Sequence, residues 1–170
     1  MRVSAEEWAA GALSDDKIEE LVASFDERGL FVLENVVPKD VLDQLAVKMV
    51  ADAAAIVAHG GFAARGEFGH GHLQLGQPRM APHVHPEVVA NPIIEQVVVA
   101  ILRRDARLGF FNGNCAMPSS GVQRLHMDDQ WDWHSAEEAA AAGEPWPHRT
   151  TSVHVNICPT TDVTEHNGGT

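Results

Sequence analysis

Four stretches of the chain place apolar residues at the spacing of a helical face. In residues 14–29 the apolar positions recur every three or four residues, between a serine that can cap the first turn and a glycine that can end the last. The same spacing runs through residues 38–59 and 91–102, where a proline suits the first turn. Residues 135–143 hold an alanine run between a serine and a glycine. The pattern therefore predicts four helices.

Other stretches are typical of strands. Residues 30–33 form a short apolar run that predicts a buried strand, and residues 108–117 and 150–158 alternate between two faces. A further strand is predicted over residues 122–128. Residues 60–90 are rich in Gly, Pro and His without a period, which indicates a long loop folded over another part of the molecule. Helices followed by strands indicate an α+β fold whose strands form a barrel or sandwich.

The amino-acid composition limits the classes of function and partner that fit the chain. A chain of 170 residues, 45% hydrophobic and 21% charged, suits a single domain. The net charge of −12 argues against nucleic-acid or anionic-membrane partners, so we expect a small-molecule substrate. Cys115 and Cys158 are too few for a disulfide framework, and neither a leader nor a membrane-spanning apolar run is evident. We therefore expect a soluble, cytoplasmic protein.

The strongest candidate chemistry lies in the strand predicted at residues 122–128. His126 precedes Asp128 by two residues, which places both side chains on the same side of a strand. An imidazole and a carboxylate are two of the three ligands in the two-histidine, one-carboxylate arrangement that leaves open positions on Fe(II). Chance alone supplies such a pair roughly once in a chain of this composition. The alternative is a solvated strand end, with Trp131 and Trp133 in the core.

The loop histidines form a rival cluster. His83, His85 and Glu87 alternate with other residues and have the chemistry of metal ligands, but Val84 and Pro86 give no clear strand around them. We interpret the loop histidines as solvated or lid residues, with a Zn²⁺-dependent hydrolytic or isomerising enzyme as the alternative. The cluster also includes His70 and His72.

Three ordered segments carry a resemblance to a known family. An opening helix leads into residues 25–33 and then Val36-Val37-Pro38; Gln123-x-x-His126-x-Asp128 follows; residues 162–170 contain an Asn-Gly turn. In this order the segments resemble the phytanoyl-CoA dioxygenase family of Fe(II)- and 2-oxoglutarate-dependent oxygenases. The likeness extends over nearly all of the chain.

The resemblance implies a double-stranded β-helix, or jelly-roll barrel, with iron in its mouth. It implies that O₂ and the cosubstrate 2-oxoglutarate are converted to succinate, CO₂ and an oxidised C–H bond of a small substrate. The iron ligands would be His126 and Asp128. Gln123 matches a position that holds 2-oxoglutarate in several relatives, although a regular strand would turn it away from the ligands unless a bulge intervenes. Weaker candidates for the same pocket, for which strand-pairing or turn roles are the alternative, are Asn112, Asn156 and Thr170.

Two departures from the family pattern matter. Met127 stands where relatives frequently have a polar residue, which leaves the ligands unchanged. In the family, the second iron-binding histidine and the arginine for 2-oxoglutarate come well after the Asn-Gly turn. We therefore expect residues 1–170 to be the N-terminal part of a longer oxygenase, inactive alone. The alternative is a non-catalytic jelly-roll domain that binds a small molecule. Substrate choice is expected to depend on residues 60–90 and 129–149. Three tryptophans could line an apolar substrate pocket or could equally belong to the core: Trp131, Trp133 and Trp146.

Overall fold

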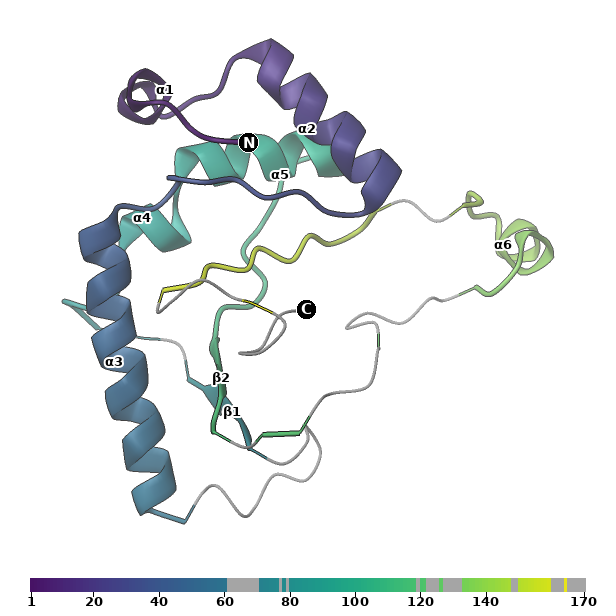
Figure 1. Ribbon diagram of the computed structural model, residues 1–170. Helices are drawn as coiled ribbons and strands as arrows, with labels where there is room; N and C mark the ends of the chain where they lie inside the picture. Colours follow the sequence, from purple (N-terminus) through teal and green to yellow (C-terminus); the bar gives the residue numbers. More distant parts are fainter. Residues whose placement is uncertain are drawn as a thin grey trace.

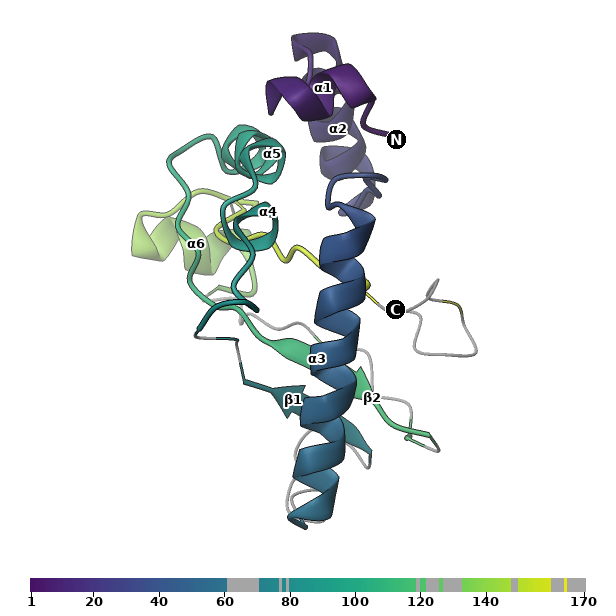
Figure 2. The same ribbon diagram turned by 90° about the vertical axis from the view of Figure 1, so that its left-hand side faces the viewer.

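The structure is a computed structural model, in which a helical layer and a small sheet lie at opposite ends of one long helix (Figures 1 and 2). It describes residues 1–60, 71–76, 78, 80–118, 120–121, 126, 133–147, 150–159 and 164. The elements are α1 (Ala5–Ala10), α2 (Asp15–Arg28), α3 (Lys39–Ala58), β1 (His72–Leu75), α4 (Pro86–Val89), α5 (Pro92–Leu102), β2 (Gly113–Ala116) and α6 (Ala136–Ala142).

Local capping explains where the predicted helices begin and end. The Ser14 side chain accepts a hydrogen bond from the first turn of α2, and Gly29 ends the helix at a φ of 75°. Asn91 caps α5 by accepting hydrogen bonds from two backbone N–H groups. Ser135 and Gly143 bound α6 in the same way. All four predicted helices, α3 included, are confirmed.

An additional helix, α1, was not predicted. Its signal is a capping box in which Ser4 Oγ accepts from Glu7 N at 3.2 Å while Glu7 Oε2 accepts from Ser4 N at 2.8 Å. Gly11 ends the helix in a left-handed conformation. Six residues are too few for a periodic apolar pattern to become visible, whereas the Ser-x-x-Glu spacing could have been recognised.

The main hydrophobic core lies where α2 packs on α5. Leu21 and Ile93 are each only 2% exposed, and they anchor a cluster that also takes in the N-terminal segment. Gln96 supports it by joining α5 to the backbone of Leu13, with bonds of 2.8 and 3.2 Å. The other buried members of the cluster are Val3, Leu13, Val36, Val97 and Ile101.

A second, smaller core lies between α3 and the sheet. β1 pairs antiparallel with β2, in a register that matches His72 with Ala116 and Leu75 with Gly113. Leu73 and Leu75 are buried against Ala53 of α3. Their alternation with half-buried neighbours is the period-two pattern of a sheet with one covered face. The partly buried residues around this core are Met49, Ile56, Cys115 and Met117.

The predicted buried strand over residues 30–33 is wrong. Leu30 and Val32 are 63% and 65% exposed, whereas Phe31 and Leu33 pack against the helical core. The segment does not form a strand. Next to it, Arg2 and Glu34 form an isolated parallel bridge. A strand needs successive ladder partners, so this apolar run becomes a half-covered extended segment.

The predicted strand over residues 150–158 is also wrong. Val153 packs against the helical core, whereas Val155, which was expected on the same side, is 46% exposed. The Arg104 side chain donates a hydrogen bond to the backbone oxygen of Thr151 at 2.9 Å. This oxygen therefore bonds to a side chain, where a strand would bond to the backbone of a neighbouring strand. The alternating sequence therefore forms an irregular segment.

Two further predictions are corrected in part. Of the strand predicted over residues 108–117, only β2 forms, and Leu108 and Phe110 are 64% and 72% exposed. The length of β2 matches that of β1, its partner in the two-stranded sheet. The expected loop over residues 60–90 contains β1 and α4, both too short to produce a visible period.

The described residues form an α+β structure, as the sequence predicts. Two paired strands, β1 and β2, do not establish a jelly-roll barrel, which therefore stays a prediction. No helix within the described ranges combines the length and apolar composition needed to cross a bilayer.

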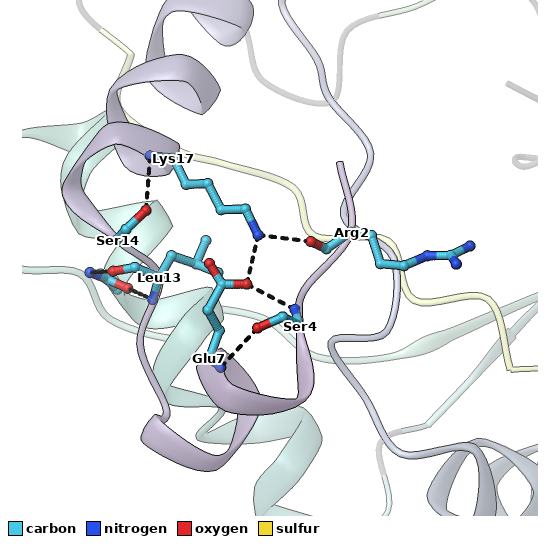
Figure 3. Close-up of polar contacts among 7 residues, drawn as sticks. Arg2, Ser4, Glu7, Leu13, Ser14 and Lys17 are labelled. Atoms are coloured by element: carbon cyan, nitrogen blue, oxygen red, sulfur yellow. Dashed lines mark hydrogen bonds and ion pairs between the residues drawn. The ribbon is translucent and has the colours of Figure 1, made fainter.

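A charged network joins α1 to α2 (Figure 3). Lys17 Nζ donates to Glu7 Oε2 at 2.6 Å and to the carbonyl oxygen of Arg2 at 2.9 Å. The Lys17 and Glu7 side chains are 27% and 17% exposed, so solvent screens this pair less than a surface pair. The bond from Lys17, followed by the one from Ser4 N, lowers the pKa of Glu7 below its ordinary value of 4.5.

We predict that Leu21→Ala lowers the free energy of unfolding by about 2–5 kcal/mol, because it leaves a cavity in the main core. Leu30→Ala is the matched control, since the same atoms are removed from a side chain that is 63% exposed. Urea unfolding of both variants measures the difference. Equal losses would contradict the position of the core.

We predict that Glu7→Gln weakens the dependence of stability on acid pH. A lowered carboxyl pKa stabilises the fold fully above about pH 4.5, and this contribution disappears as the pH falls through the folded-state pKa. The difference in unfolding free energy between about pH 6 and about pH 3.5, measured with urea, should therefore be smaller in the variant.

Glu34→Gln is the control for this measurement. Arg2 lowers the pKa of Glu34, but the two side chains are 71% and 51% exposed, so solvent weakens their interaction. The control should flatten the pH dependence less than Glu7→Gln does. The reverse order would contradict the role given to Lys17.

Candidate functional site

The chain that leads toward His126 is fixed to the start of β1. Beyond β2, Met117 N donates to the carbonyl oxygen of Gly71 at 2.9 Å. The Nε2 atom of His72 lies 2.6 Å from the carbonyl oxygen of Gly121. A carbonyl oxygen can only accept, so Nε2 carries the proton in this bond. These contacts place Gly121, five residues before His126, beside the sheet.

Gly71 allows the close approach of these two segments. Its φ of +84° lies in the left-handed region, and a Cβ atom there would lie 2.8 Å from the Cα and Cβ atoms of Ser120. Both the backbone conformation and the contact therefore exclude a larger residue without rearrangement. The glycine was not singled out from the sequence, although a Gly directly before a strand is a recognisable signal.

The structure describes three of the six predicted site residues. His126 is exposed and lies outside the strands, Asn112 is half-buried just before β2, and Asn156 is exposed on the irregular segment that follows α6. The remaining three lie outside the described residues: Gln123, Asp128 and Thr170.

A complete metal site is not formed by the described residues. Within those ranges there is no group of three or more His, Cys, Asp or Glu side chains that could hold a metal ion. Cys115 is partly buried against α3, and burial raises the pKa of its thiol. Its Sγ lies 3.8 Å from Met117 Sδ. A thiol kept protonated in this way is a core residue and a poor nucleophile.

The interpretation of the loop histidines as solvated is wrong for His85. This residue is only 8% exposed, directly before α4, and His83 is half-buried. His72 belongs to β1, and His70 lies outside the described residues. Composition suggested exposure, because Gly- and Pro-rich segments usually lie on the surface, whereas packing around α4 covers this part of the segment.

The tryptophans predicted to line a substrate pocket have different environments. Trp146 is 47% exposed after α6, and Trp133 is half-buried before it, whereas Trp131 lies outside the described residues. A hollow of about 210 Å³ occurs elsewhere, beside α1 and the start of α5. None of the predicted site residues lines it; its walls include Trp8, Pro86, Glu87, Asn91 and Ile93.

Comparison with protein families assigns no family to the chain. No family model matches it. The resemblance to the phytanoyl-CoA dioxygenases therefore rests on the residues quoted above, and the function drawn from it is a proposal.

We predict that Gly71→Ala destabilises the protein by roughly 1–3 kcal/mol, because it forces a left-handed residue with a side chain against Ser120. Gly76→Ala is the matched control at the other end of β1, where a Cβ would meet nothing within 4 Å. Urea unfolding gives the stability. Amide exchange after β2 should quicken in the first variant alone, and equal behaviour of both would contradict the close contact.

Proposed function

We propose that this chain carries the iron-binding front part of an Fe(II)- and 2-oxoglutarate-dependent dioxygenase. The observation that carries the proposal is the Gln123-x-x-His126-x-Asp128 spacing, in order between the two flanking segments that resemble the same family. His126 and Asp128 would ligate the iron, and Gln123 would contact 2-oxoglutarate. The substrate would be a small organic molecule with an unactivated C–H bond.

The donor set fits two of the three protein ligands that such an iron requires. Of these two, His126 is an exposed residue. The proposal assigns neither the second histidine nor the arginine for 2-oxoglutarate, which in the family follow the Asn-Gly turn. The jelly-roll barrel is likewise a part of the proposal that comes from the family resemblance. The coarser α+β fold is consistent with it.

The bound iron and 2-oxoglutarate would supply the oxidising chemistry, and the protein would supply position. The anchored turn before His126 has a clear part in this. His72 holds Gly121, five residues before the proposed ligand, so the start of the ligand-bearing segment is tied to a strand that α3 covers. A supported ligand loses less entropy when it binds a metal than one on a free loop.

A non-catalytic domain that binds a small molecule is the alternative. It would share the fold and the exposed His126 but would not consume 2-oxoglutarate. Turnover separates the two functions, because binding alone produces no succinate.

We predict that the full-length gene product forms succinate from 2-oxoglutarate with Fe(II) and O₂, and that His126→Ala abolishes this. Loss of one of three ligands removes the metal from its position. His59→Ala is the matched control, since His59 is an exposed residue at the end of α3 whose Nδ1 lies 2.8 Å from the Ala55 carbonyl oxygen. Chromatographic detection of succinate measures turnover.

Anaerobic titration of the same protein with Fe(II) and 2-oxoglutarate gives a second readout. A visible charge-transfer band should appear in the wild type and in His59→Ala, and be lost in His126→Ala. A full-length protein that shows neither the band nor succinate would refute the oxygenase function. A bound small molecule without turnover would favour the non-catalytic alternative.

A further inference from the structure

Two imidazole nitrogens are buried near α4 without a hydrogen-bond partner. They are Nδ1 of His83 and Nε2 of His85. Among the described residues, these are the buried side-chain nitrogen and oxygen atoms that lack a hydrogen-bond partner. His85 is 92% buried, so bulk water does not reach it freely. Buried polar atoms nearly always have a partner, and an orphaned pair so close in sequence indicates a ligand, an ion or a water at that place.

The backbone around the pair is well fixed. His83 N donates to the carbonyl oxygen of Met80 at 3.1 Å, which closes a turn. His85 has extended dihedrals, φ −104° and ψ 117°, and its carbonyl oxygen accepts from Val88 and Val89 in α4 at 3.0 and 3.1 Å. One residue separates the two histidines. Both unpartnered nitrogens therefore lie within the short segment that leads from this turn into α4.

The chemistry of the pair identifies the class of ligand. Neutral imidazole nitrogen is the commonest protein ligand for Zn²⁺ and also suits Cu²⁺ and Ni²⁺. The two rings are neutral when they ligate a metal, so each can offer a lone pair to a cation. We propose that His83 Nδ1 and His85 Nε2 together bind one Zn²⁺-class divalent cation.

Water would complete the coordination of this cation. The described residues contain no third His, Cys, Asp or Glu side chain placed to complete a metal site with the two histidines. A tetrahedral zinc with two protein ligands keeps two positions for water.

The site is independent of the proposed iron site. It uses neither His126 nor Asp128, and it follows from burial rather than from a family resemblance. The two assignments can therefore fail separately.

Calorimetric titration of the metal-free protein with Zn²⁺ tests the proposal. His83→Ala and His85→Ala should each weaken binding by about tenfold or more, because each removes a ligand. His59→Ala is the control, because His59 is exposed at the end of α3, and it should leave this binding event within about twofold of the wild type. Zinc affinity that is unchanged in the first two variants, or absent in the wild type, overturns the proposal.

A measurement on the wild type alone guards against a variant that fails to fold. In long-range ¹H–¹⁵N spectra of the histidine rings, Zn²⁺ should shift the Nδ1 signal of His83 and the Nε2 signal of His85. Shifts confined to other histidines, or to the opposite ring nitrogens, overturn the assignment. A shift at both named atoms supports it even where the alanine variants unfold.

Discussion

The antiparallel pairing of β1 with β2 is the constraint on which the candidate site depends. One face of the pair is covered by α3, through Leu73 and Leu75 against Ala53. The start of the same pair fixes the chain beyond β2, because His72 holds Gly121 and Gly71 leaves room for Ser120. Loss of the pairing would therefore remove a hydrophobic core and the support of the segment that contains His126. The four residues of each strand therefore contribute both to the stability of the protein and to the position of the chain beyond β2.

The helices were predictable because their signals are local. Caps such as Ser14 and Asn91 satisfy backbone groups within one turn, and the apolar period falls within a single element. Strands depend on a partner that the local sequence does not name. Residues 150–158 have the residue types of a strand yet form an irregular segment. Residues 30–33 meet the N-terminal segment only through a few backbone hydrogen bonds and one isolated bridge next to them. The coarse α+β class was thus within reach of the sequence, and the strand boundaries were not.

The candidate site was predictable in its chemistry and not in its surroundings. The spacing of His126 and Asp128 is visible in any reading of the chain, because metal ligands are defined by residue type. Burial is decided by packing between distant elements. The solvated alternative was therefore wrong for His85. Asn112 lies before β2 and Asn156 after α6, and their place in one pocket stays a prediction. His72 was counted among possible metal ligands, whereas its ring forms a hydrogen bond that orders the backbone.

The difference in exposure between His126 and His85 has a chemical meaning for the two proposed metal sites. A catalytic iron must keep positions open to a cosubstrate and O₂, which requires access such as that of the exposed His126. A cation held by His85 would be largely enclosed beside α4, where exchange with solvent is slow and reaction with a substrate is hindered. Its effect would be on the segment between the sheet and α5, because satisfying the orphaned nitrogens removes a desolvation cost that the folded state otherwise carries. In the two proposals the metals would therefore have different roles: the iron at His126 would serve catalysis, and the cation at His85 would support the fold around α4.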